Sequence, residues 1–186
     1  MYDDEFELTF DLSDKDEASR APEPEQEPVQ EAAPEPAAET EPPVEAVPEP
    51  AVPAANGRCV LISGGDRGIG AAAARAFWQA GYRVAVLYHT HAEAAAALEK
   101  ALPGLLAVQC DVASRASCEV AFHTVEQAVG HVDVLVSNAG IAQQKLFTDI
   151  TPEEWQHMLD VNLSGAFHLC QLALPGMIRR KAGRIL

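Results

Sequence analysis

The stretch Ser63-Gly64-Gly65-Asp66-Arg67-Gly68-Ile69-Gly70 lies between an apolar run, residues 59–62, and a helical pattern over residues 68–80. Glycine lets a backbone turn tightly and approach another group closely, and Gly64, Gly68 and Gly70 take those positions here. The amides and the dipole of a helix N-terminus attract an anion. A glycine-rich turn from a first strand into a first helix therefore predicts a site for the pyrophosphate of a dinucleotide. The alternative is the same turn without a ligand.

Apolar runs and helical patterns alternate along the chain that follows. The runs cover residues 59–62, 82–87, 105–108 and 132–136, and the helical patterns between them cover residues 68–80, 91–101 and 114–129, with Ser114 as the expected N-cap of the third. The runs are nearly continuous, as in strands that are buried on both faces of a parallel sheet. The pattern predicts an α/β fold: a Rossmann-type, doubly wound parallel sheet that is incomplete.

Residues 151–186 predict a long helical region and the start of another strand. Thr151 and Glu154 form the pattern of a capping box, with Pro152 at the first helical position. We expect this region to contain a break and to kink or end early at Pro175. A fifth strand begins at residues 184–186, and we expect it to leave the apolar edge of strand 132–136 unpaired and prone to aggregation.

The end of the second predicted strand indicates which dinucleotide binds. Sites for NAD usually place Asp or Glu about 20 residues after the glycines, where it holds the ribose 2′-hydroxyl. Here Leu87-Tyr88-His89-Thr90 carries no acid, and Arg67 can pair with a 2′-phosphate. The sequence therefore favours NADP(H) over NAD, with Asp66 pointing to solvent. His89 and His91 have no evident third metal ligand, so we predict no metal site and expect His89 beside the adenosine ribose.

A second motif, Asn138-Ala139-Gly140, follows the fourth apolar run. With Gly64-x-x-x-Gly68-x-Gly70 it makes the chain resemble the short-chain dehydrogenase/reductase family over residues 58–186, most closely the 3-oxoacyl-[acyl-carrier-protein] reductases. The resemblance implies an NADPH-dependent oxidoreductase that reduces a ketone, a small-molecule or acyl-carrier-bound 3-oxoacyl thioester, to the alcohol in fatty acid biosynthesis. It also implies a homo-oligomer.

The resemblance also assigns roles to single residues. Asp111 would accept a hydrogen bond from the adenine amino group, although it can also be read as a loop acid near a helix start. Asn162 matches a catalytic asparagine that breaks the long helix and holds a water for proton relay. The residues implied to bind the cofactor are Ser63, Gly64, Gly65, Asp66, Arg67, Gly68, Ile69, Gly70, His89, Asp111, Val112, Asn138, Ala139 and Gly140. Two positions depart from the family pattern: Ser63 replaces Thr, and Ser137 replaces Asn.

The family's catalytic Ser and Tyr-x-x-x-Lys cannot be placed in this sequence. Its tyrosines are Tyr2, Tyr82 and Tyr88, and none has Lys four residues later. Positioned proton transfer contributes about 10²–10⁴-fold to such reactions. We therefore expect a C-terminally truncated piece of a longer enzyme. The alternatives are a non-catalytic NADP(H)-binding module or pseudoenzyme, and an interaction protein that acts through its N-terminal tail.

The charge of the chain is concentrated in residues 1–56. The net charge is −15, and this segment holds all of it, whereas residues 57–186 are neutral. Residues 1–56 are rich in Pro, Glu and Ala and predict a disordered acidic tail, and residues 57–186 the NADP(H)-binding domain. The alternation of Phe6, Leu8, Phe10 and Leu12 with polar residues is either a docking motif for an unknown partner or part of a solvated tail.

Composition excludes several other classes of protein. No basic stripe is present, so nucleic-acid binding is not expected. No apolar run approaches the roughly 20 residues that cross a bilayer, and the acidic N-terminus has no apolar signal segment. Four cysteines without a Cys-x-x-Cys pair indicate a reducing compartment. We expect a cytoplasmic protein.

Overall fold

The computed structural model describes residues 55–186, so all but the last two residues of the predicted tail lie outside the described part. The strands are β1 (Cys59–Ser63), β2 (Arg83–Tyr88), β3 (Leu106–Gln109), β4 (Val134–Val136) and β5 (Arg184–Ile185). The helices are α1 (Gly68–Gln79), α2 (Ala92–Ala101), α3 (Arg115–Val129), α4 (Pro152–Leu159) and α5 (Gly165–Arg180), with a 3-10 turn η1 (Phe147–Asp149) and a π turn η2 (Asp160–Ser164).

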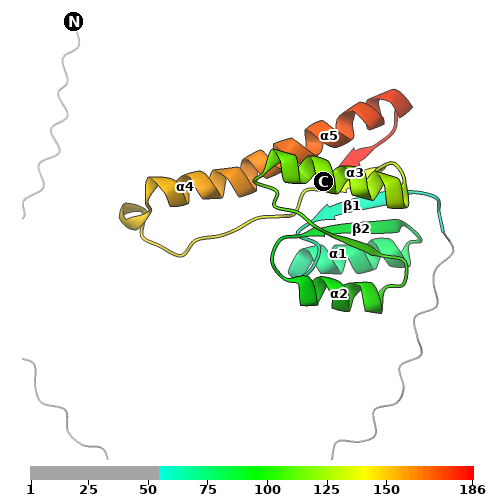
Figure 1. Ribbon diagram of the computed structural model, residues 1–186, viewed down its shortest axis with the longest axis horizontal. Coiled ribbons are helices and arrows are strands. Elements are labelled where there is room, and N and C mark those ends of the chain that lie inside the picture. Colours follow the sequence, from blue (N-terminus) through cyan, green and yellow to red (C-terminus); the bar gives the residue numbers. More distant parts are fainter. Residues whose placement is uncertain (1–54) are drawn as a thin grey trace, which may run out of the picture. The chain divides into compact units, whose positions relative to one another are not determined.

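The five strands form one parallel sheet in the order β3-β2-β1-β4-β5, which confirms the predicted α/β fold. Neighbouring residues of β1 point to opposite faces of this sheet. Val60 and Ile62 pack in one core cluster with α1 and α2, and Leu61 packs in the other with α3 and α5. Figure 1 shows these two helical layers on either side of the strands. Because both faces of the sheet are buried, the strands appear in the sequence as continuous apolar runs.

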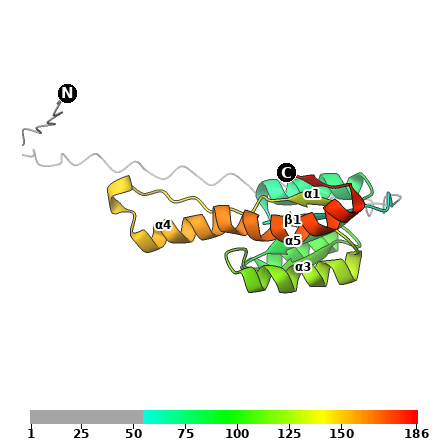
Figure 2. The same cartoon turned by 90° about the horizontal axis from the view of Figure 1, so that it is seen from above.

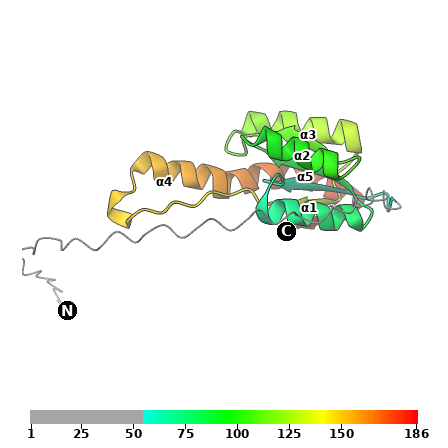
Figure 3. The same ribbon diagram turned by 90° about the horizontal axis from the view of Figure 1, so that it is seen from below.

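The C-terminal helices form one long rod, and part of it extends beyond the sheet. Figures 2 and 3 show α4 and the loop before it well away from the strands, while α5 lies against them. The predicted break is present as the π turn between α4 and α5. Of the two outcomes expected at Pro175, an early end is wrong, because α5 continues to Arg180 with Pro175 inside it. Leu169, Ala173 and Met177 are buried on its sheet-facing side, and this packing outweighs the hydrogen bond that proline cannot donate.

The expected unpaired edge at β4 is also not found. Val134 pairs with Arg184 and Leu135 with Ile185, and Leu186 N donates to Leu135 O over 2.9 Å. A short segment is sufficient because Leu186 uses both of its backbone groups on this neighbour: its carbonyl also accepts from Ser137 N over 2.8 Å. In the described part of the chain, no helix has the length and apolar character needed to cross a bilayer.

Both predicted helix caps are present. Ser114 accepts a hydrogen bond from Ser117 N at the start of α3, and Thr151 and Glu154 form the full capping box at the start of α4. We expect Thr151→Ala to weaken this end of α4 by about 1 kcal/mol. Hydrogen exchange of the Glu154 and Trp155 amides should then be about fivefold faster, with Thr148→Ala as an exposed control. Unchanged exchange would show that the cap contributes nothing.

The same cap gives α4 a dependence on pH. Lys145 and the Thr151 amide bind the Glu154 carboxylate and lower its pKa below the ordinary 4.5. A carboxyl group whose pKa is lower in the folded state stabilises that state above its unfolded pKa, and the effect is lost as the pH falls through the folded value. The protection of these amides should therefore decrease on acidification below about pH 4.5.

Candidate functional site

A cavity of about 390 Å³ opens at the carboxyl ends of the strands. Its walls come from the loops that follow β1, β2, β3 and β4, with His157 and Val161 from the α4–η2 region. The strand order reverses between β1 and β4, and α/β proteins bind ligands at such a switch point. The volume lies within the range of small-molecule sites.

The glycine loop has the backbone shape that a phosphate-binding turn requires. Gly64 and Gly68 have φ of 62° and 54°, a region that disfavours side chains. The first hydrogen bond within α1 joins Ala71 N to Arg67 O, so the amides of the first turn have no acceptor inside the helix. A Cβ at Gly70 would lie 2.1 Å from Gly64 O, where no atom fits. The loop and helix end therefore fit the pyrophosphate of a dinucleotide.

Asn138 and Ser63 fix this loop from the neighbouring strand end. The Asn138 side-chain amide donates to Ser63 O and Gly64 O, both over 3.0 Å. The Ser63 hydroxyl accepts from the backbone amides of Asn138 and Ala139, also over 3.0 Å. Ser63 is only 1% exposed, so it supports the loop from below and does not face the cavity.

The residues predicted after β2 and β3 lie on the cavity wall. Asp111 lines the cavity, and its Oδ1 also accepts a hydrogen bond from Ala113 N over 3.0 Å. Val112 is buried beside it, and His89, which follows β2, lines the same cavity. Asp111 thus closes its own loop as a residue near a helix start, and its role toward the adenine stays a prediction.

Asn162 lies in the π turn and does not line the cavity. Its side chain accepts from Ile141 N over 2.8 Å and donates to Ile141 O over 2.9 Å. It thereby ties the long helical rod to the chain that follows Gly140. A π turn inside a helix frequently marks a functional site, and a polar residue at mid-helix is the sequence signal for it.

The structure brings most of the predicted residues to one cavity. Those that line it are Gly64, Asp66, Arg67, Gly68, Ile69, His89, Asp111, Val112, Asn138, Ala139 and Gly140. Four predicted residues lie behind the wall or beside it: Ser63, Gly65, Gly70 and Asn162. Lining residues that the sequence reasoning missed are Leu87, Tyr88, Thr90, His91, Cys110, Ile141, His157 and Val161.

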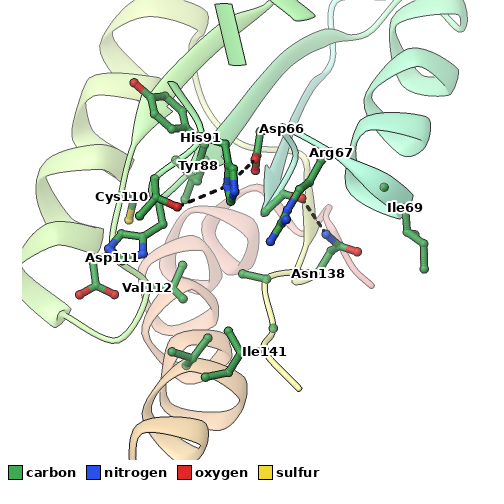
Figure 4. A pocket seen from close by; sticks show the side chains of 18 of the residues that line it. Asp66, Arg67, Ile69, Tyr88, His91, Cys110, Asp111, Val112, Asn138 and Ile141 are labelled. Atoms are coloured by element: carbon green, nitrogen blue, oxygen red, sulfur yellow. Dashed lines mark hydrogen bonds and ion pairs between the residues drawn. The ribbon is translucent and has the colours of Figure 1, made fainter. Parts of the chain in front are cut away.

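The expectation that Asp66 points to solvent is wrong. The residue is only 9% exposed, and its carboxylate turns toward His91 at the cavity wall (Figure 4). The expectation was wrong because the chain after β2 covers this side of the glycine loop, a contact between segments that are distant in sequence.

One thiol, that of Cys110, also lines the cavity. Its sulfur lies 3.9 Å from that of Cys118, and this hydrogen bond lowers the pKa of Cys110 while it raises the pKa of Cys118. Burial raises the pKa of Cys59 to about 11. Among residues 55–186, no group of three or more His, Cys, Asp or Glu side chains could hold a metal ion.

Comparison with known proteins identifies the family. The model of the short chain dehydrogenases matches residues 58–186, which is most of the chain. The chain belongs to the short-chain dehydrogenase family. This assignment confirms the resemblance seen in the sequence, and members of the family bind a nicotinamide cofactor.

Named relatives of this short-chain dehydrogenase include two kinds of reductase. It is 38% identical over 129 residues to the acetoacetyl-CoA reductase of Paracoccus denitrificans, covering 69% of this chain and 53% of that protein. It is 40% identical over 129 residues to the 3-oxoacyl-[acyl-carrier-protein] reductase MabA of Mycobacterium tuberculosis, covering 69% and 49%. The chain thus spans about half the length of these relatives.

Solved structures of short-chain dehydrogenases show the same fold. A mutant short-chain dehydrogenase/reductase from Serratia marcescens superposes with a TM-score of 0.62 at 30% identity, over 64% of this chain and 50% of that one. A putative short-chain dehydrogenase from Novosphingobium aromaticivorans gives 0.62 at 31% identity, over 67% and 47%.

Proposed function

We propose that this chain is the cofactor-binding part of an NADPH-dependent reductase that converts a 3-oxoacyl thioester to the 3-hydroxyacyl product. The observation that carries the proposal is the glycine loop at the cavity, with its open helix N-terminus and with Gly70 packed against Gly64. The loop amides would hold the pyrophosphate, Asp111 would face the adenine, and the Asn138–Gly140 segment would face the nicotinamide side.

Arg67 supports the choice of NADPH over NADH. Its side chain is exposed and extends toward the cavity (Figure 4), and within residues 55–186 it takes part in no ion pair. The strand end after β2 offers histidines instead of the usual acid. A free guanidinium at this wall suits a phosphate, which it can bind with two hydrogen bonds.

The names of the relatives support the choice of substrate. One is an acetoacetyl-CoA reductase and the other a 3-oxoacyl-[acyl-carrier-protein] reductase, and both names denote reduction of a 3-oxoacyl thioester. NADPH bound by the glycine loop would supply the hydride for the carbonyl carbon, and an acid of the whole protein or the solvent would supply the proton for the carbonyl oxygen. In this chain, Asn162 holds the backbone at Ile141 and so positions the wall of the cavity next to Gly140. We assign the complete reaction to the whole protein.

Nucleotide titration of the chain tests this proposal. We expect isothermal titration calorimetry to show NADPH binding at least tenfold tighter than NADH, since a bidentate charged pair contributes roughly 1.5–3 kcal/mol. Arg67→Glu should reverse this preference because it replaces the phosphate ligand with a repelling carboxylate. Arg75→Glu, an exposed arginine on α1 away from the cavity, is the matched control and should change neither affinity.

Two results would contradict the proposal. If the chain binds neither nucleotide, the site is not a dinucleotide site. If Arg67→Glu leaves the NADPH affinity unchanged, the assignment of the 2′-phosphate to Arg67 is wrong. For the substrate, acetoacetyl-CoA should be reduced by the whole protein with NADPH and should fail to be reduced when Gly70 is replaced.

A further inference from the structure

A buried carboxylate on the cavity wall lacks a hydrogen-bond partner. The Asp66 side chain is only 6% exposed, and its Oδ2 atom has no hydrogen-bond partner in the described part of the chain. His91 Nδ1 lies 3.6 Å away, close enough for an ion pair but beyond a hydrogen bond. Leaving a buried charged oxygen without a donor is costly. Both residues line the cavity, so a ligand there can supply the missing donor or charge.

The position of this carboxylate has a specific meaning in a dinucleotide fold. In such folds an acid at the end of the second strand binds the 2′-hydroxyl of the adenosine ribose. Here the segment after β2 supplies His91, while the acid comes from the loop after β1 (Figure 4). Asp66 therefore places a negative charge beside the end of β2, where the sequence after the strand has no acidic residue of its own.

We propose that Asp66 and His91 form a pair that determines whether the cavity prefers a ribose 2′-hydroxyl or a 2′-phosphate; this rests on the proposed function as a dinucleotide site. The Asp66 carboxylate accepts a hydrogen bond from a hydroxyl and repels a phosphate. The imidazole of His91, whose Nδ1 lies 3.6 Å from Asp66 Oδ2, offsets that charge, so that Arg67, on the same wall, can hold the phosphate. His91 thus acts on cofactor choice through Asp66.

The two residues should have opposite effects on nucleotide affinity. His91→Gln removes the imidazole beside Asp66 and should weaken NADPH binding by about fivefold, since a half-exposed pair contributes up to about 1 kcal/mol, with little change for NADH. Asp66→Asn removes the repulsion and should tighten NADPH binding, while NADH binding weakens by about tenfold because a charged acceptor is lost. Both substitutions are nearly isosteric, and neither breaks a hydrogen bond of the Asp66 carboxylate Oδ2. His91→Gln also removes the hydrogen bond between His91 Nδ1 and the Thr90 hydroxyl, 3.3 Å apart.

Two further variants test whether His91 acts on NADPH affinity through Asp66 or independently of it. The double variant Asp66→Asn/His91→Gln should recover the NADPH affinity that His91→Gln loses, because the charge that His91 offsets is gone. His91→Lys places a cation at this position and should retain the NADPH preference. His123→Gln on α3 and Asp149→Asn in η1, both exposed and away from the cavity, are matched controls.

Calorimetric affinities for NADPH and NADH decide the outcome, with a thermal unfolding scan of each variant to confirm that it folds. The inference is supported if the two single variants shift the NADPH-to-NADH ratio in opposite directions and the double variant recovers NADPH binding. It is overturned if the wild-type chain binds NADPH but both single variants leave the ratio unchanged, or if the effects of the two substitutions simply add. Failure of the wild-type chain to bind either nucleotide would instead refute the proposed function.

Discussion

Gly70→Ala abolishes NADPH binding in our expectation and lowers the free energy of unfolding by about 2 kcal/mol. The added Cβ would lie 2.1 Å from Gly64 O and 2.7 Å from the Asn138 side-chain amide nitrogen. Neither neighbour is the flexible end of a side chain, since one is backbone and the other is held by two hydrogen bonds. The turn must therefore open, and the amides that we expect to face the pyrophosphate move with it. Calorimetry measures the binding, and urea denaturation followed by circular dichroism measures the stability.

Gly176→Ala is the matched control for this substitution. Gly176 lies inside α5, where an added Cβ meets no backbone and only the end of the Arg180 side chain, with Nη1 at 3.0 Å. That guanidinium donates to Val132 O through its other nitrogen, Nη2, so Nη1 needs to move by only a few tenths of an ångström. Alanine is favoured over glycine in a helix by roughly 1 kcal/mol, so this variant should be unchanged or slightly more stable. If Gly70→Ala behaves like the control and still binds NADPH, the close packing of Gly70 against Gly64 is not what shapes the site.

Asn138→Asp should lower the free energy of unfolding by about 3 kcal/mol and weaken NADPH binding at least tenfold. The side chain keeps its size, but its two donor bonds to Ser63 O and Gly64 O become contacts between acceptors. Those carbonyls are part-buried, so water cannot fully replace the lost donor. The glycine loop loses the two side-chain hydrogen bonds that hold it, and a negative charge enters the wall of the proposed phosphate site.

Asn56→Asp makes the same chemical change on the surface. Asn56 also donates from its side chain to a backbone carbonyl, that of Ala80, over 2.9 Å, but the bond is exposed. Water can satisfy both groups there, so we expect a loss below about 0.5 kcal/mol and unchanged NADPH affinity. Equal effects of the two substitutions on stability and binding would contradict the role given to Asn138.

Local patterns in the sequence predicted much of the fold. The strands β1 to β4 and the helices α1 to α3 lie within a few residues of their predicted ranges, because two-sided burial and helical periodicity are encoded over short windows. The capping box at Thr151 was predictable for the same reason, since all its atoms lie within four residues. The cavity also collects most of the residues that the sequence singled out, because strand ends of a parallel sheet meet at one edge.

The features that were missed depend on contacts between distant segments. Burial of Asp66 depends on the chain after β2, and the partner of Asn162 is a backbone group 21 residues away. Continuation of α5 past Pro175 depends on packing against the sheet. No window of sequence contains both sides of these contacts. From the sequence, His91 was therefore interpreted as a loop residue. In the structure it lies beside the Asp66 carboxylate, which we expect to influence cofactor choice.

The hydrogen bonds that Asn138, Ala139 and Ser63 form around the glycine loop, here called the brace, affect the stage of folding at which the site forms. Its hydrogen bonds join residues that are 74 to 76 positions apart, so the loop acquires its shape only when β4 pairs with β1. A nascent chain that has been synthesised as far as Gly130 already carries the entire motif, yet it lacks every bond of this brace. Only chains in which β4 has paired with β1 should therefore bind the nucleotide. A ligand that binds only the loop held by these hydrogen bonds shifts the folding equilibrium toward the state in which β1 and β4 are paired, by mass action.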